Sequence, residues 1–194
     1  ARRADEVAVE REQQLLIRAI ANHGEWSLRR LKAVVQSDLS VSAGDIDQTP
    51  AWIQKRLSAW LSPLLDHSLV VVVNSADEIV YSQTGRKRPG VEPTISSATT
   101  PALQSIVDSV RGRARSSPSG AIRLVGGEDP ARPGAGTVFL QDIGDKLSVV
   151  TVVPTVQPAA IGDRNGASPI VLSVRLIEQS VLAAIGERLQ LANL

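Results

Sequence analysis

The side chains with the clearest potential for chemistry are two tryptophans and an arginine that follow one another at intervals of four residues. Trp52, Arg56 and Trp60 would share one stripe of a helix, because residues four apart on a helix are neighbours. The guanidinium would then stack between two indole rings, and such a stack can line a pocket and present the arginine to a carboxylate. The alternative is core packing, with Trp60 in a buried face and Trp52 at its rim. Tyr81, on the predicted hairpin that follows, is a further candidate for the pocket.

Residues suited to catalysis or metal binding are few. The chain has two histidines and no cysteine, which excludes a thiol nucleophile and leaves a poor set of metal ligands. Asp66-His67-Ser68 has the residue types of a catalytic triad, but neighbours in an extended chain point to opposite faces and cannot converge on one substrate. The glycines around 126 and 134 lack the Gly-Lys-Ser/Thr ending of a phosphate loop. We therefore predict no catalytic residue, no metal and no cofactor, and we expect this chain not to be an enzyme.

Composition narrows the class of protein further. The chain has 194 residues, 43% of them hydrophobic and 21% charged, with a net charge of +1. This suits one soluble domain with enough material for a core, and it does not favour nucleic acid as a partner. No apolar run reaches the length of about 18 residues that a membrane helix needs.

Two basic clusters could contact an anion or a membrane surface. They are Arg86-Lys87-Arg88 and the group Arg111, Arg113 and Arg115. We expect both to be mainly solvated charge, and the second group also suits the negative end of a helix that finishes there. An anion or membrane contact is the alternative for both clusters.

The elements that must position these residues follow from periodicity and turn chemistry. The pattern predicts helices at 1–37, 51–65, 102–115 and 176–194, and strands at 68–74, 78–83, 121–125, 137–141, 147–156 and 168–175. Thr49-Pro50 and Thr100-Pro101 give helix starts, with threonine as a cap and proline at the first helical position. Strand pairs lie close together in the sequence, so we expect a mainly antiparallel sheet of five or six strands flanked by helices, an α+β fold.

The helical ends of the chain predict how it is connected. The chain divides into a helix at 1–37, an α/β core at 50–175 and a second helix at 176–194. Both ends are helical without caps and the chain has no methionine, so we expect a piece of a longer protein. The apolar stripes of the two terminal helices have the spacing that helix pairing requires. We therefore expect the terminal helices to pair in a homodimer and to transmit a signal, through Leu16, Ile20, Leu182, Ile185 and Leu189.

Two segments resemble a known family. The first runs from Trp52 through the valine-rich stretch Leu69 to Asn74 and on to Glu78-Ile79-Val80-Tyr81; the second is Ile170 to Ile177 and the helical stretch that follows it. Both resemble extracytoplasmic sensor domains called CHASE, of the fourth type. In that family a helix, a valine-rich strand, a turn and a strand ending in Val-Tyr occur together, and a strand followed by Arg-Leu and a helix closes the domain. The resemblance covers nearly the whole chain in the order of its elements.

One departure from the family concerns the first helix. The family commonly has aromatic residues beside a Trp-Asp pair there. Here the region is His23-Gly24-Glu25-Trp26-Ser27-Leu28, so the tryptophan is present and the following acid is not. Trp26 is therefore a candidate ligand-binding residue, without the acid that accompanies it in the family.

The resemblance implies a PAS-like or Cache-like domain between two transmembrane helices, in the periplasm and anchored in the bacterial inner membrane. It further implies a cytoplasmic output module, either a diguanylate cyclase and phosphodiesterase pair or a histidine kinase. We expect the domain to bind a small signal, which would be anionic if Arg56 contacts it. The alternative is a module of the same kind of receptor that binds no small ligand and senses a protein or a membrane.

Overall fold

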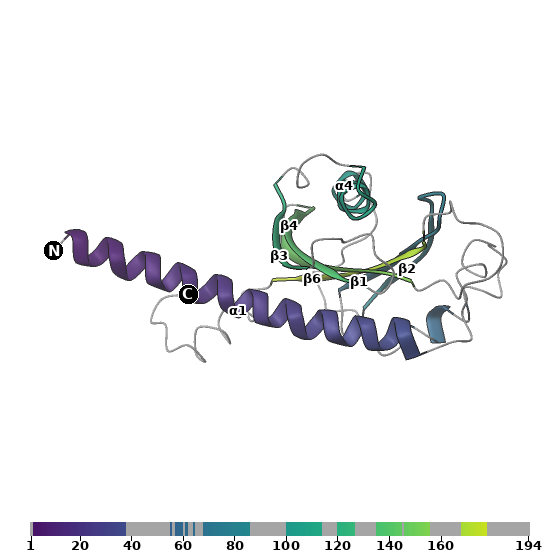
Figure 1. Ribbon diagram of the computed structural model, residues 1–194, viewed down its shortest axis with the longest axis horizontal. Helices are drawn as coiled ribbons and strands as arrows, with labels where there is room; N and C mark the ends of the chain where they lie inside the picture. The colour runs from purple at the N-terminus through teal and green to yellow at the C-terminus, as the bar shows by residue number, and fades with distance from the viewer. Residues whose placement is uncertain are drawn as a thin grey trace.

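A six-stranded antiparallel sheet lies between a long helix and a short one in this computed structural model (Figure 1). The structure describes residues 2–37, 55, 57–59, 61, 64, 68–85, 100–113, 120–126, 135–144, 146–155 and 168–177. Its elements are α1 (Arg2–Ser37), β1 (Leu69–Val73), β2 (Ile79–Thr84), α4 (Thr100–Val110), β3 (Ile122–Gly126), β4 (Thr137–Ile143), β5 (Lys146–Pro154) and β6 (Ile170–Leu176). The predicted α+β class and the antiparallel sheet are confirmed.

The strand order is β2-β1-β6-β5-β4-β3. Strands β3 to β6 form a meander, and β1 and β2 form the predicted hairpin. The two parts join where β1 pairs with β6, with Val71 opposite Leu172. Central strands covered on both faces are usually apolar along their whole length. Accordingly, β1 reads Leu-Val-Val-Val-Val, and all five of these residues are buried.

Helix α1 covers one face of the sheet and approaches it closely at a glycine. Its buried residues recur at helical spacing, and they are Ile20, Gly24, Ser27, Leu28, Leu31, Val34 and Val35. A Cβ at Gly24 would lie 2.7 Å from Cγ1 of Val138 and 3.6 Å from Cγ1 of Val149. The glycine that weakens the helix by propensity therefore allows the helix to rest on β4 and β5. The N-terminal part of α1 continues past the sheet (Figure 1).

Helix α4 covers the opposite face. Its predicted apolar residues Leu103, Ile106, Val107 and Val110 are all buried, against a layer that includes the fully buried Phe139. The helix ends before Gly112, whose φ of 70° is the left-handed conformation that favours glycine at a helix C-terminus. The described residues thus form three layers, with a separate apolar core on each side of the sheet.

The element boundaries differ slightly from those predicted. Helix α4 begins at Thr100 and ends at Val110, whereas the prediction ran from 102 to 115. Strand β6 extends to Leu176, which the prediction placed in the last helix. Of the predicted helix at 51–65, residues 55 and 57–59 are helical, and of its other residues only 61 and 64 are described. Residues 178–194 lie outside the described part of the chain. Among the described helices, none has the length and hydropathy of a membrane span.

Candidate functional site

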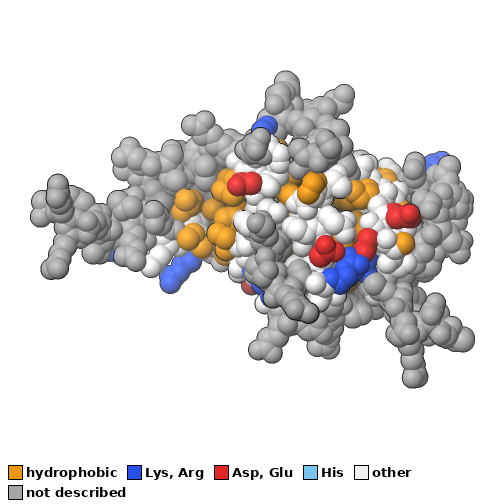
Figure 2. All heavy atoms as spheres, turned by 90° about the horizontal axis from the view of Figure 1, so that it is seen from above, with side chains coloured by type: hydrophobic (Ala, Val, Ile, Leu, Met, Phe, Trp, Pro, Cys, Tyr) orange, Lys and Arg blue, Asp and Glu red, His pale blue; other side chains and the backbone are white. Residues whose placement is uncertain are grey.

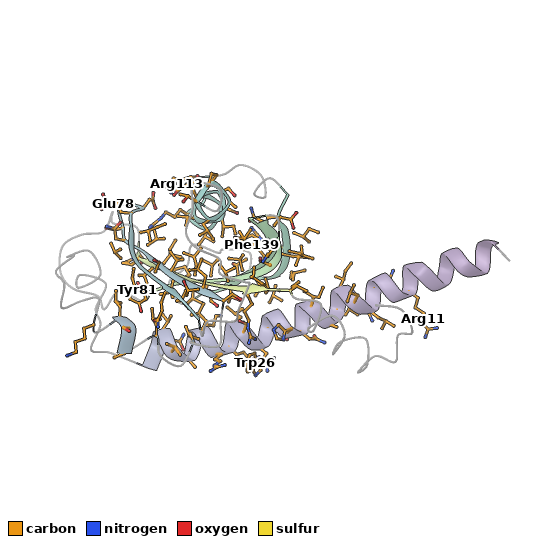
Figure 3. All side chains as sticks on the ribbon, turned by 180° about the vertical axis from the view of Figure 1, so that it is seen from behind. Arg11, Trp26, Glu78, Tyr81, Arg113 and Phe139 are labelled. Atoms are coloured by element: carbon orange, nitrogen blue, oxygen red, sulfur yellow. The ribbon has the colours of Figure 1, made fainter. Side chains whose placement is uncertain are left out.

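A cationic and aromatic cluster joins the outer side of α1 to the end of β6. We call it the Trp26 junction, and it consists of His23, Trp26, Arg30 and Arg175. The guanidinium carbons of Arg30 and Arg175 lie 5.4 and 5.5 Å from the centroid of the Trp26 ring, within the range of a cation–π contact. The His23 ring is stacked on the indole with centroids 6.1 Å apart. Trp26 is still 49% exposed, and it lies on the side of α1 away from the sheet (Figure 3).

A hydrogen bond fixes the ionisation state at this junction. Nη1 of Arg175 lies 3.0 Å from Nε2 of His23. A guanidinium can only donate, so Nε2 must accept, which leaves the imidazole proton on Nδ1. Burial and then the charge of Arg175 lower the pKa of His23, because both disfavour a second positive charge here. The junction therefore holds a neutral histidine at neutral pH.

Arg175 connects the junction to the end of a central strand, β6. Arg175 is the charged residue of an otherwise apolar and serine strand, and it lies opposite Val149 in the ladder. Just beyond it, the backbone N–H of Leu176 donates to Oγ of Ser68 at 3.2 Å, and that of Ile177 donates to the carbonyl of Leu147 at 2.9 Å. The end of a central strand is thus tied both to the long helix and to its neighbouring strands.

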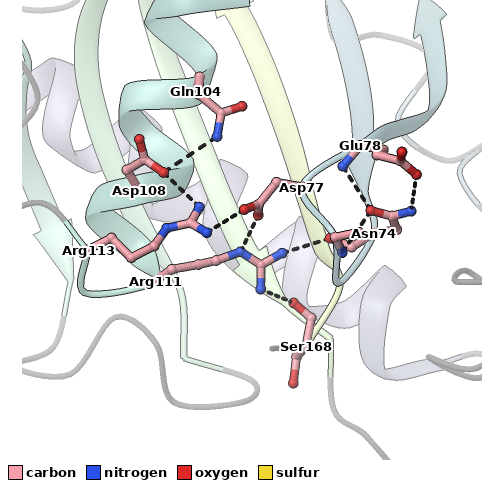
Figure 4. A network of polar contacts seen from close by, with 9 residues as sticks. Asn74, Asp77, Glu78, Gln104, Asp108, Arg111, Arg113 and Ser168 are labelled. Carbon is pink, nitrogen blue, oxygen red and sulfur yellow. Dashed lines mark hydrogen bonds and ion pairs between the residues drawn. The ribbon is translucent and has the colours of Figure 1, made fainter. Parts of the chain in front are cut away.

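A second polar cluster lies on the other side of the sheet. We call it the Asp77 clamp, and it consists of Asn74, Asp77, Asp108, Arg111 and Arg113. Nε of Arg111 lies 2.6 Å from Oδ1 of Asp77, and Arg113 forms ion pairs with Asp77 and, at 2.7 Å, with Asp108. Figure 4 shows both guanidinium groups converging on Asp77, and Figure 2 shows acidic and basic side chains lying together on the α4 side of the molecule.

Arg111 also joins the clamp to backbone carbonyl groups that flank two strands. Its Nη2 donates to the carbonyl of Asn74 at 2.7 Å and its Nη1 to that of Ser168 at 3.2 Å. The end of α4 is therefore fastened both to the β1–β2 turn and to the residues that precede β6. The Arg111 side chain is only 7% exposed, so the prediction of solvated charge is wrong for this residue. Arg111 can be buried because Asp77, in a turn far away in the sequence, supplies the charged partner that a buried guanidinium requires.

The turn that supplies Asp77 is itself shaped by hydrogen bonds. The Asn74 side-chain oxygen accepts from the backbone N–H of Ala76 at 3.0 Å and of Glu78 at 2.8 Å, a common asparagine turn. Asp77 has a φ of 67°, which aspartate tolerates better than most residues. Burial raises the pKa of Asp77, but the hydrogen bond from Arg113 and the charge of Arg111 outweigh it, and the net pKa is lowered.

Neither cluster has the composition of a catalytic or metal site. Within the described residues, no three His, Cys, Asp or Glu side chains gather as metal ligands would. Both clusters instead connect layers of the fold, with the Trp26 junction linking β6 to α1 and the Asp77 clamp linking β6 and β1 to α4.

Comparison with protein families assigns the chain to a family. The family model of the CHASE4 domain matches residues 19–194. The chain belongs to the CHASE4 family. CHASE4 domains are extracytoplasmic sensor domains of signalling proteins and are not catalytic, which agrees with the family that the sequence resembles. A comparison with curated proteins gave no match.

The predicted pocket of this CHASE4 domain falls mostly outside the described residues. Trp52, Arg56 and Trp60 lie there, as do Arg86-Lys87-Arg88 and Arg115. Tyr81 is described; it is half-buried on β2, and its hydroxyl group hydrogen-bonds to Gln83. Burial raises the pKa of Tyr81 against the opposing effect of a hydrogen bond with Ser58. That bond places Ser58 beside β2, and the pocket itself stays a prediction.

The predicted transmission residues are described only on α1. Ile20 is 5% exposed and lies in the core between α1 and the sheet, and the half-buried Leu16 packs against the same core. Leu182, Ile185 and Leu189 lie outside the described residues. Pairing of the terminal helices stays a prediction.

Sequence reasoning named Trp26 but missed its three partners. Arg175 had a readable signal, since a single arginine in a strand of apolar residues and serine needs a partner when its neighbours are buried. His23 and Arg30 lie three residues before and four residues after Trp26, which places them beside it on a helix.

Proposed function

We propose that this CHASE4 domain is the periplasmic sensor of a membrane-bound bacterial receptor and that it passes its signal to α1 through β6. The observation that carries the proposal is Arg175, which hydrogen-bonds to His23 and lies over Trp26 at the end of a central strand. A displacement of β6 would move Arg175, and α1 would have to follow or lose these contacts.

The signal in this proposal is a small anionic molecule. Arg56, between Trp52 and Trp60, would bind its negative group, and Tyr81 would line the same pocket, near Ser58. The half-exposed Trp26 would respond to the occupied state rather than form the pocket. Binding can shift an equilibrium only when the ligand has different affinities for two arrangements of the domain. Here those arrangements would differ in the position of β6 against α1.

The proposal for the rest of the receptor is based on the family. The strand order, with β1 and β6 paired inside the sheet, and the helices on both faces support a PAS-like or Cache-like domain. We propose that it acts as a homodimer, and that the longer protein carries a diguanylate cyclase and phosphodiesterase pair or a histidine kinase in the cytoplasm.

A thermal-shift experiment tests ligand binding. We expect inorganic phosphate, succinate or citrate to raise the melting temperature of the wild-type domain. For Arg56→Ala, the ligand concentration that gives the same rise should be at least tenfold higher. Lys55→Ala is the matched control, because Lys55 is an exposed cation one residue away. Absence of any shift would reject an anionic signal of this kind, and an equal shift in Arg56→Ala would reject the role of Arg56.

A second candidate function is a module that binds a protein or a membrane and no small ligand. The observation that favours it is the half-exposed Trp26, which lies beside the cationic side chains Arg30 and Arg175 on the outer side of α1. A wild-type domain that no small anion stabilises, but that binds vesicles or an envelope protein through Trp26, would support this candidate.

A further inference from the structure

The inward stripe of α1 continues beyond the sheet that covers it. Ile17 precedes Ile20 by three residues and Gly24 by seven, so all three share one face of the helix. Ile20 is 5% exposed, whereas Ile17 is 53% exposed. Gly24 rests on Val138 and Val149, and Ile17 lies about 10 Å farther along the helix axis. The stripe thus remains apolar at Ile17, where α1 is no longer fully covered.

The sheet is also uncovered at this end and on this face. Leu147 precedes Val149 by two residues on β5, so both point to the α1 side, yet Leu147 is 41% exposed. Ile122 lies opposite Leu140 at the edge of the sheet, and it is 59% exposed. Seen from the α4 side, Figure 2 shows further hydrophobic side chains toward the end of the molecule from which α1 projects.

These side chains form one surface, which we call the exit surface. It consists of Leu16, Ile17, Ile122, Leu147 and Ile177. Leu16 and Ile177 pack against the same core cluster as Ile20, and the backbone of Ile177 is hydrogen-bonded to Leu147. The chain therefore leaves the sheet at the exit surface itself.

We propose that residues 178–194 of the same chain cover the exit surface as a helix antiparallel to α1. The segment begins at this surface, and it carries apolar residues at helical spacing: Val181, Leu182, Ile185 and Leu189. A helix of that length spans about 25 Å, close to the length of about 20 Å from Arg2 to Leu16. The segment follows directly on Ile177, which is itself part of the exit surface. Its effective concentration at this surface is therefore high, whereas a second copy of the chain has no such advantage.

This inference deepens the proposed route of transmission and rests on it for its role in signalling. With residues 178–194 against α1, a movement of β6 would change the helix pair that leaves the domain. The helix pair itself depends only on the exit surface, so its test requires no ligand. Its failure would leave ligand binding untouched, and failure of the ligand screen would leave the helix pair untouched.

Disulfide trapping tests the inference, because the chain has no native cysteine to interfere. Ile17→Cys is combined with Leu182→Cys or with Ile185→Cys in the full chain, and the proteins are oxidised. We expect an intrachain disulfide, seen as a faster-migrating monomer on non-reducing gels, in at least one of the two pairs. Asn22→Cys, an exposed position on another side of α1, is the matched control and should give at least fivefold less product.

The other outcomes overturn the proposal. Disulfide-linked dimers would assign the exit surface to a second copy of the chain. Equal products from Ile17→Cys and Asn22→Cys, or no product from either, would show that the segment does not lie on this face.

Hydrogen exchange gives a measurement that does not depend on cysteine geometry. In the full chain, Leu182→Asp combined with Ile185→Asp should reduce amide protection around Leu16 and Ile17 at least tenfold. Gln179→Asp combined with Gln190→Asp adds the same charges at polar positions and should leave that protection unchanged. Unchanged protection in the first variant would contradict the proposal.

Discussion

The Trp26 junction and the Asp77 clamp fasten β6 to opposite layers by different physical means. At the junction, two guanidinium groups and an imidazole surround a half-exposed indole. At the clamp, a buried guanidinium reaches a carboxylate and two backbone carbonyl groups. Exposed cation–π contacts contribute about 0.5–1 kcal/mol, whereas removing one partner of a buried ion pair costs about 3–5 kcal/mol.

The difference suggests a division of labour between the two faces. The clamp should keep α4, the β1–β2 turn and the start of β6 in one arrangement. The junction should change at smaller cost, because its contacts surround a half-exposed ring. A sensor needs both properties, since a fixed part must bind the signal in a defined way and an adjustable part must report it.

Arg111→Ala should give the largest effect. The substitution removes one of the two guanidinium partners of Asp77 and takes the Arg111 donor from the carbonyl groups of Asn74 and Ser168. We expect the free energy of unfolding to fall by about 3 kcal/mol. Denaturant unfolding measures this change. Arg29→Ala is the control, because the exposed pair of Arg29 with Glu25 at 3.4 Å should contribute under about 0.5 kcal/mol. Equal losses in the two variants would remove the distinction between a buried clamp and surface charge.

Gly24→Ala should have a smaller effect and an unusual sign. In an exposed helix this change stabilises by about 1 kcal/mol, but here the new methyl group would lie 2.7 Å from Val138. We expect a net loss of about 1–2 kcal/mol from overpacking, together with altered Trp26 fluorescence as α1 shifts. Asn22→Ala, at an exposed site on the same helix, should not destabilise the domain. A gain in stability for Gly24→Ala would mean that α1 is not fixed against the sheet at this point.

The smallest expected effect is a difference in how the two clusters make stability depend on pH. Because the pKa of His23 is lowered in the folded state, the unfolded state takes up a proton first, at about pH 6.5. Stability from neutral His23 is therefore present above that pH and is lost as the pH falls through the lowered pKa. The Asp77 pKa is also lowered, so the clamp stays ionised throughout this range. The melting temperature should fall less from pH 7.5 to 5.5 in His23→Gln than in the wild type, and equal falls would contradict the assignment.

Local patterns in the sequence predicted most of the fold. The β1–β2 hairpin follows from two β-branched runs with polar turn residues between them, and the buried face of α4 follows from the spacing of Leu103, Ile106, Val107 and Val110. These features depend on neighbours in the chain, so the periodicity of one segment is enough to reveal them.

Long-range contacts could not be predicted in the same way. Nothing in either segment states that β1 pairs with β6, because both are apolar strands that could pair with several partners. Arg111 gave the same difficulty, since its partner Asp77 lies in another element and no fixed spacing connects a helix end to a hairpin turn. The Trp26 junction was half visible, through the tryptophan on α1 and the lone arginine of β6.

Strand β6 has one further consequence for how the domain could work. The clamp holds the residues just before the strand and the junction holds its second-last residue, and the distance between these points is about 20 Å. A fully paired central strand resists stretching, so it conveys displacement along its axis with little loss. Sliding by a fraction of an ångström at the α4 end would thus reappear as an equal movement under α1, on the opposite surface of the sheet. A displacement could then pass from α4 to α1 without bending of the sheet.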